Sequence, residues 1–227
     1  MQPADPAGFG LALTLAVWGV AVALSRRIHW LNPVLTTTAA IIVVLLVANV
    51  SYADYRSGTD VLVSLIAPAV VALALPVVRM GARIGRAMPW VVLIAVGGGT
   101  IGVSSTVLIA WALGVSRDQI IDLAGKHATS PVSAAIAGQL GGSPSLAAVL
   151  AILTGVLGAS LGPLVLRLFS VRDSAVRGLL YGVTAHSIGT SRAIHEGEET
   201  AGFSAIGMAL SALIVPVLVL GTVALFL

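Results

Sequence analysis

Hydrophobic residues run through this chain in blocks of about 20 that short polar segments separate. A helical block of that length crosses the hydrocarbon core of a membrane, and the roughly ten-residue alternation of an outer-membrane barrel strand does not occur. The pattern predicts an all-α integral membrane protein with about six transmembrane helices. Full spans are expected near residues 9–25, 31–50, 60–79, 89–113, 146–168 and 203–226.

The composition supports this class of protein. Of 227 residues, 58% are hydrophobic and 9% are charged, whereas a soluble domain has about a quarter charged residues. The absence of cysteine excludes disulfides, thiol catalysis and thiolate metal sites. Because the basic residues stand singly in loops, the net charge of +3 does not indicate nucleic-acid binding. We expect a multi-pass protein of the cell (inner or cytoplasmic) membrane.

The basic residues also predict an orientation in the membrane. Those that follow the first, third and fifth spans are Arg26, Arg27, Arg79, Arg83, Arg86, Arg167, Arg172 and Arg177. The opposite loops hold three basic residues, which nearby acids offset. The positive-inside rule then puts both termini outside, provided that residues 127–142 and 186–201 each enter and leave on one side.

Two local features refine the spans. Residues 1–10 carry no basic region, so the first span is expected to stay as an anchor and not to be cleaved as a signal peptide. Pro68 and Pro76 lie inside the third span, where they predict a kink, and a gate or substrate-facing break is the alternative.

An internal repeat appears when the sequence is shifted by 59 residues. "KHATSPVSAAIAGQLGGSPS" (126–145) then aligns without a gap with "AHSIGTSRAIHEGEETAGFS" (185–204), and His127 falls on His186. Small residues recur at every fourth position, which is one helix face. They are Ser130, Ala134, Gly138 and Gly142 in the first copy, and Gly189, Ala193, Gly197 and Ala201 in the second. A chance match is the alternative, because the chain is rich in alanine and glycine.

Each repeat unit combines one span, a short amphipathic connector and a broken, re-entrant helical hairpin, over residues 88–142 and 147–201. One full crossing per unit makes the repeat inverted, as in transporters that bind substrate near the bilayer midplane between discontinuous helices. We expect residues 1–87 to scaffold or dimerise, and residues 88–227 to form a transport-like unit that ends in the span 203–226. Together they would form one membrane domain.

The hairpins suggest a site for a small carboxylate. Ser130 and Thr190 are candidate N-caps, and a helix start inside the membrane offers free amide groups and about half a positive charge. Hydroxyls and imidazoles would add donors, and the Arg192 guanidinium would bind two carboxylate oxygens. The candidate binding residues are His127, Thr129, Ser130, His186, Gly189, Thr190, Ser191 and Arg192.

The acids after Arg192 form a second group. Glu196 and Glu199 share a helix face with Arg192, so Arg192 can pair with Glu196 and leave other acids to titrate. Residues predicted to couple protons or form ion pairs are His195, Glu196, Glu198 and Glu199. The alternative is a solvent-exposed loop whose charged side chains are hydrated and have no other role.

Catalysis is a weaker interpretation of the same residues. "HEGEE" gives H-E-x-x-E, in which an acid replaces the second histidine of the metalloprotease motif. A serine triad of His186, Ser187 or Ser191, and Glu196 would lack a nucleophile elbow and an oxyanion loop. We therefore predict no enzyme activity, no metal and no cofactor.

"HSIGTSRAIHEGEETAGFSAIGMALSAL" resembles the C-terminal signature of the LrgB/CidB family of membrane proteins, and the resemblance runs from about Asn32 to the C-terminus. The family often reads Pro-Lys-Ser where this chain has Gly125, Lys126 and His127. The resemblance implies one of two functions. Bacterial members are described as holin-like or antiholin-like regulators of murein hydrolase export and autolysis, with a small LrgA/CidA-type membrane partner. Plant members resemble a fusion of the two and transport glycolate and glycerate in plastids, and some bacterial members are linked to pyruvate uptake.

The leading hypothesis is secondary transport of small monocarboxylates such as pyruvate, glycolate, lactate or glycerate, coupled to protons and carried out by a homodimer in the lipid bilayer. The alternative is an antiholin-like regulator that acts through the small membrane partner.

Overall fold

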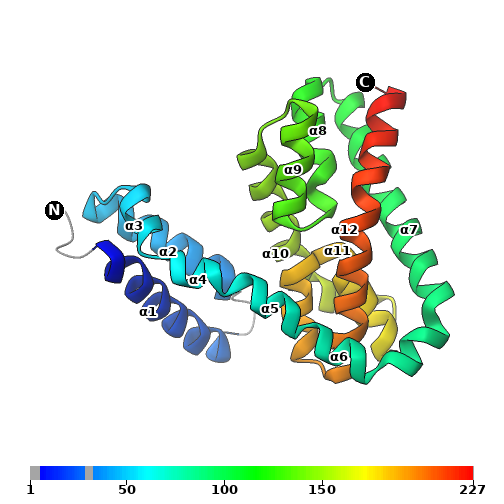
Figure 1. Ribbon diagram of the computed structural model, residues 1–227, viewed down its shortest axis with the longest axis horizontal. Helices are drawn as coiled ribbons and strands as arrows, with labels where there is room; N and C mark the ends of the chain where they lie inside the picture. The colour runs from blue at the N-terminus through cyan, green and yellow to red at the C-terminus, as the bar shows by residue number, and fades with distance from the viewer. Residues whose placement is uncertain (1–5, 29–32, 227) are drawn as a thin grey trace. The chain divides into compact units, whose positions relative to one another are not determined.

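The computed structural model describes residues 6–28 and 33–226, which are helical with no strand (Figure 1). Five described segments are long and apolar enough to cross a membrane. The prediction of an all-α membrane protein is therefore confirmed. The chain forms two compact units, residues 1–72 and 73–227, which are described separately.

The first unit contains five helices. They are α1 (Pro6–Arg27), α2 (Pro33–Ala48), α3 (Tyr52–Ser57), α4 (Asp60–Ser64) and α5 (Ile66–Ala72). Helix α1 packs against α2 and α3, and the hydroxyl groups of Thr14 and Tyr55 lie 2.8 Å apart. Helix α2 has 16 residues, which at about 1.5 Å per residue is shorter than the hydrocarbon core. The second predicted span thus appears as a shorter apolar helix.

The third predicted span is divided into α4, α5 and α6 (Ala74–Arg79), with interruptions at Leu65 and Leu73. Pro68 and Pro76 each come three residues after an interruption. A proline has no amide N–H and its ring clashes with the carbonyl four residues earlier, so the preceding helix ends there. The helix is thus interrupted twice in the segment where the prolines predict a kink.

Three long helices frame the second unit. They are α7 (Gly81–Ala112), α10 (Pro144–Leu168) and α12 (Glu198–Phe226), with 32, 25 and 29 residues. At about 1.5 Å per residue each is longer than the roughly 30 Å hydrocarbon core. Helix α12 begins at Glu198 and not near residue 203, because the acids of its first turn suit a helix N-terminus and pair with arginines.

Two hairpins lie between these helices. The first hairpin (residues 117–140) consists of α8 (Arg117–Ala124), η1 (Gly125–His127) and α9 (Ser130–Leu140). The second hairpin is α11 (Ser174–Ile194), whose backbone reverses direction at His186. Helices α8 and α9 lie at one end of the unit and α11 lies at the other (Figure 1). The two hairpins therefore enter the unit from opposite ends, in the arrangement of an inverted repeat.

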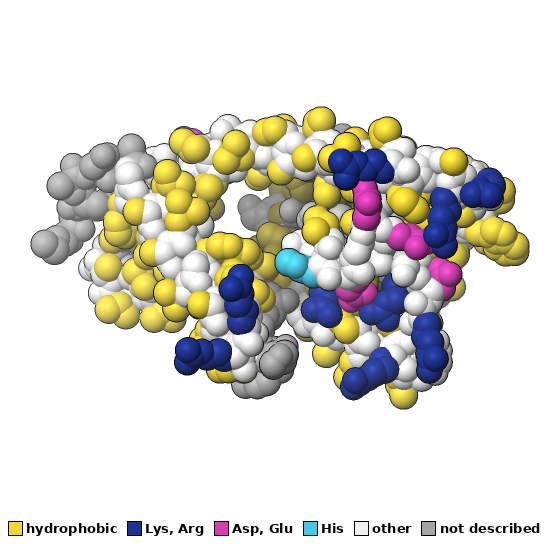
Figure 2. Space-filling view, turned by 90° about the horizontal axis from the view of Figure 1, so that it is seen from below, with side chains coloured by type: hydrophobic (Ala, Val, Ile, Leu, Met, Phe, Trp, Pro, Cys, Tyr) yellow, Lys and Arg dark blue, Asp and Glu magenta, His cyan; other side chains and the backbone are white. Residues whose placement is uncertain are grey.

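The basic end is the end of this unit where α6, α11 and the start of α12 lie. Figure 2 views the molecule from this side and shows arginines around several acids. The side chains that define the basic end are Arg79, Arg83, Arg86, Arg167, Arg172 and Arg177.

The second hairpin packs closely against α12. A methyl group on Gly178 would overlap the carbonyl oxygen of Thr200, and one on Gly182 would overlap that of Ser204. Because only glycine permits this approach, the two backbones are nearly in contact along the seam. A buried cluster joins α7 to both helices through Ile84, Val91, Ala95, Leu179, Val183 and Phe203.

Candidate functional site

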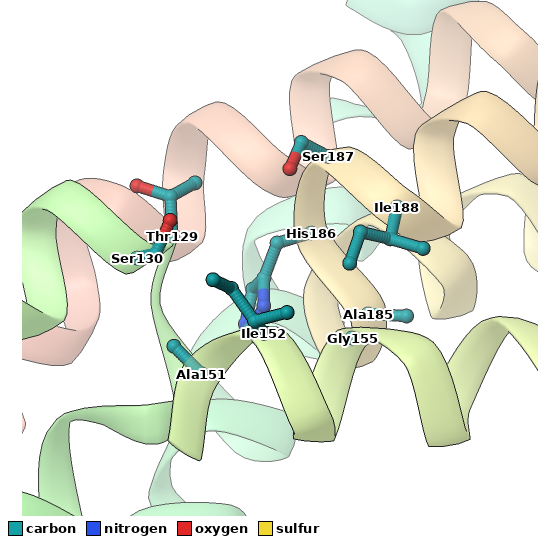
Figure 3. A pocket seen from close by; sticks show the side chains of 9 residues that line it. All are labelled: Thr129, Ser130, Ala151, Ile152, Gly155, Ala185, His186, Ser187 and Ile188. Atoms are coloured by element: carbon teal, nitrogen blue, oxygen red, sulfur yellow. The ribbon is translucent and has the colours of Figure 1, made fainter. Parts of the chain in front are cut away.

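The tips of the two hairpins meet at a cavity of about 200 Å³ beside α10 (Figure 3). Thr129 and Ser130 come from the first tip, and Ala185, His186, Ser187 and Ile188 come from the second. Ala151, Ile152 and Gly155 of α10 complete the lining. The cavity therefore combines hydroxyl and imidazole groups with short apolar side chains.

The first tip is an extended turn before a helix. The backbone is extended at Ala128 and Thr129, and α9 begins at Ser130 with Pro131 in its first turn. Thr129, and not Ser130 as predicted, occupies the N-cap position. Its backbone is extended, whereas Ser130 is already part of the helix. Its side chain accepts no capping bond, so the first amides of α9 have no side-chain acceptor.

The second tip depends on an unusual backbone conformation. His186 has φ 51° and ψ −131°, which an L-residue adopts at a cost of about 1–3 kcal/mol. The hydroxyl of Thr190 donates to the His186 carbonyl at 2.8 Å and lies 2.9 Å from the Ser204 hydroxyl on α12. Thr190 is therefore a buried residue of the second leg that links the reversal at His186 to α12. It is not the predicted N-cap, because the helix restarts directly after His186.

The two tip histidines differ in their hydrogen bonds. His127 Nε2 lies 2.9 Å from the Thr106 hydroxyl, and its ring packs on Gly102. The His186 side chain is 3% exposed, and its Nε2 has no hydrogen-bond partner among the described residues. Figure 3 shows this ring projecting toward α10 at the cavity. Burying a nitrogen without a hydrogen-bond partner costs free energy, so a ligand that formed a hydrogen bond with His186 Nε2 would recover this cost on binding.

Several predicted binding residues lie away from the cavity. The cavity lining includes Thr129, Ser130 and His186, and does not include His127, Gly189, Thr190, Ser191 or Arg192. Gly189 packs against the backbone of Tyr181, which brings the two legs of the second hairpin together. Ser191 and Arg192 are exposed. Sequence reasoning did not place Ser187 at the cavity, although it directly follows His186.

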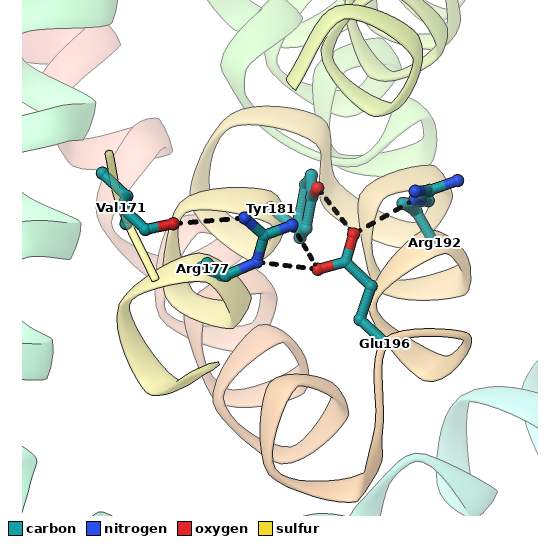
Figure 4. A network of polar contacts seen from close by, with 5 residues as sticks. All are labelled: Val171, Arg177, Tyr181, Arg192 and Glu196. Carbon is teal, nitrogen blue, oxygen red and sulfur yellow. Dashed lines mark hydrogen bonds and ion pairs between the residues drawn. The ribbon is translucent and has the colours of Figure 1, made fainter. Parts of the chain in front are cut away.

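Glu196 is the centre of a polar network at the basic end (Figure 4). Arg177 donates to Glu196 Oε2 from Nε at 2.9 Å and from a terminal nitrogen at 2.7 Å. Tyr181 and Arg192 donate to Oε1 at 2.9 and 3.3 Å. Partial burial raises the pKa of Glu196, but the bonds from Arg177 and Tyr181 outweigh this and hold its pKa below the usual value. Glu196 is therefore a charged, paired carboxylate.

The other acids of this segment also form ion pairs. Glu198 pairs with Arg79 at 3.2 Å and Glu199 with Arg83 at 2.7 Å, while His195 is exposed. None of these residues lines the cavity. Within the described ranges, no group of three His, Cys, Asp or Glu side chains is arranged to hold a metal ion.

These features define a multi-pass helical membrane protein in which two helical hairpins from opposite ends line a small pocket together with α10. Residues 14–225 match the LrgB-like family, and the chain belongs to this family, as its C-terminal signature predicted.

The chain is similar to several proteins of this kind. It is 35% identical to YxaC of Bacillus subtilis over 216 residues, which cover 94% of each chain. It is 33% identical over 194 residues to the holin-like protein CidB of Staphylococcus epidermidis, covering 84% of this chain and 85% of CidB. Identity to the holin-like protein CidB of Staphylococcus aureus is 31% over 216 residues, covering 92% and 94%. No solved structure matches the chain.

Proposed function

We propose that this protein transports a small monocarboxylate, such as pyruvate, glycolate, lactate or glycerate, across the cell membrane. The observation that carries the proposal is the cavity between the opposed hairpin tips, into which the unpartnered Nε2 of His186 projects. Discontinuous helices that meet in this way are the usual binding element of transporters with inverted repeats.

The cavity chemistry suits a carboxylate. The start of α9 offers amide donors and about half a positive charge. Hydroxyl groups of Thr129, Ser130 and Ser187 add donors, and His186 can donate from Nε2. Each carboxylate oxygen accepts more than one hydrogen bond, so one small anion can satisfy several of these groups.

The cavity size limits the ligand. The empty space of about 200 Å³ includes space that is open to the surroundings, so it is an upper limit on the room for a ligand. Ala151, Ile152 and Ile188 would contact a short carbon skeleton. Both features favour acids of two or three carbons.

The residues available for proton coupling differ from those that the sequence suggested. Glu196, Glu198 and Glu199 are held in ion pairs at the basic end. Of the residues that line the cavity, His186 is the one whose side chain can bind and release a proton. We therefore assign the coupled proton to His186.

Uptake into proteoliposomes that contain only this protein tests the proposal. Labelled pyruvate and glycolate would be added with an imposed proton gradient. We expect saturable uptake that His186→Ala abolishes, because the ligand loses its partner in the cavity. His195→Ala is the matched control, and Arg192→Ala tests an exposed cation, so both should retain uptake. Absence of uptake by folded wild-type protein, or full uptake by His186→Ala, would refute the proposal.

The second candidate function is a holin-like regulator that acts on a small LrgA/CidA-type membrane protein. The names of the CidB relatives favour it. It predicts no uptake by the isolated chain and stable co-purification with the partner. It also predicts that critical substitutions lie on an exposed contact surface and not in the cavity.

A further inference from the structure

Helix α10 provides a scale along which the hairpin contacts can be compared. The cavity faces Ala151, Ile152 and Gly155 of this helix. Ser143 precedes Ala151 by eight residues, and Gly162 follows Gly155 by seven. At about 1.5 Å per residue, these points lie roughly 12 Å and 10 Å from the cavity in opposite directions.

A buried carboxylate holds the first hairpin at the Ser143 side. Asp122 of α8 is 3% exposed, and its Oδ1 accepts a bond from the Ser143 amide at 2.7 Å. A methyl group on Gly142 would overlap the same carboxylate. The contact joins the first leg of the hairpin to the chain that enters α10, between the cavity and the end opposite the basic end.

The Glu196 network holds the second hairpin on the other side. Tyr181 packs against Gly162 of α10 and donates to Glu196 in the turn before α12. Arg177, one turn earlier in α11, donates to the same carboxylate. This network also joins the first leg of a hairpin to the chain that enters the next long helix.

The two contacts occupy equivalent places in the repeat. Under the 59-residue shift, Asp122 falls on Tyr181, just as His127 falls on His186. Each side chain is five residues before the tip of its hairpin. The chemistry differs, since one contact is a carboxylate on a backbone amide and the other is a phenol and two arginines on a carboxylate.

We propose that Asp122 and Glu196 are positioning residues that close the cavity from opposite sides. Each holds the first leg of its hairpin to the chain that follows, so losing one contact exposes the cavity on that side only. The inference rests on the proposed function in treating the hairpins as the moving parts. It adds the residues that determine which side is closed.

Thiol labelling tests this inference without requiring transport. The chain has no cysteine, so Ala151→Cys places a single thiol at a buried position of the cavity lining. A membrane-impermeant maleimide would be added to one face of proteoliposomes at a time. Single cysteines in place of the exposed Arg172 and Arg117 mark the basic end and the opposite end.

The two variants should have opposite effects on the labelling of Ala151→Cys. Glu196→Ala should raise the rate about tenfold from the basic end, and Asp122→Ala should raise it about tenfold from the opposite end. Tenfold corresponds to losing one charge-assisted hydrogen bond. Glu198→Ala removes a neighbouring exposed ion pair and should leave both rates unchanged. Asp122→Asn keeps an acceptor oxygen and should restore the low rate.

Each outcome has a definite meaning. Faster labelling from both faces would indicate general loss of structure and overturn the assignment, as would unchanged rates in both alanine variants. Sided labelling without carboxylate uptake would refute the transport proposal and leave the closing contacts supported. Carboxylate uptake without sided labelling would support the transport proposal and refute the closing contacts.

Discussion

Gly182 controls how closely the second hairpin approaches α12, and its replacement by alanine should destabilise the protein. The added methyl group would overlap the Ser204 carbonyl oxygen and lie 2.9 Å from the Met208 amide nitrogen. Both are backbone atoms, so no change of side-chain rotamer relieves the overlap. The two helices must move apart.

The displacement and its cost follow from these contacts. Ordinary contact begins at 3.4 Å, so the separation at Met208 must grow by about 0.5 Å and the separation at the Ser204 carbonyl oxygen must grow by more. The same movement stretches the 2.9 Å contact between Thr190 and Ser204 that braces His186. Over-packing costs about 1–3 kcal/mol, and alanine recovers up to about 1 kcal/mol of helix propensity. The net loss is about 1–2 kcal/mol, which lowers Tm by about 2–8 °C in a chain of this size.

Thermal unfolding in detergent, followed by the loss of monodisperse protein, measures this change. Gly221→Ala is the matched control, because nothing lies within 4 Å of the methyl group that it adds to α12. This control should keep or raise Tm. If Gly182→Ala unfolds at the same temperature as Gly221→Ala, the close approach of α11 and α12 is wrong.

Two further predictions concern buried and paired groups. Because bonds from Arg177 and Tyr181 hold the pKa of Glu196 below its unfolded value, they stabilise the fold above that value and lose effect as the pH falls through the folded pKa. The Tm deficit of Glu196→Gln should therefore be largest at neutral pH and shrink as the pH falls below the ordinary pKa of a glutamate. A constant deficit would contradict this. Ser133→Ala removes a buried donor to the Ala147 carbonyl at 3.0 Å and should cost about 1–3 kcal/mol in chemical unfolding, whereas no loss would mean that this bond adds nothing.

The long helices and the two breaks were predictable because their causes are local. Hydropathy over about 20 residues identifies a span, whatever packs against it. Pro68, Pro76 and Pro131 act through their own missing amide and ring. The turn before α9 was also predictable, since the backbone is extended at Ala128 and Thr129, directly before the predicted helix start.

The assignment of side chains to the cavity was less predictable because it depends on distant contacts. The sequence pattern around Thr190 resembles an N-cap, yet packing on Ser204 draws this hydroxyl into the protein and makes His186 the point of reversal. The pairing of Arg192 with Glu196 follows from four-residue spacing, and the stronger contact from Arg177 does not. A partner 19 residues away becomes visible only when both legs of the hairpin are in place.

The inverted repeat brings the two hairpin tips to one cavity, but their backbones and side chains make the site unequal. His127 Nε2 forms a hydrogen bond with the Thr106 hydroxyl, whereas the equivalent nitrogen of His186 has no protein partner in the described structure. The first tip therefore contributes hydroxyls and the start of α9, and the second contributes the titratable group. An anion bound between them would interact with a fixed dipole on one side and an imidazole that can gain a proton on the other. Under the proposed transport function, the second hairpin would therefore carry the coupled proton, and the first hairpin would supply a site of constant charge.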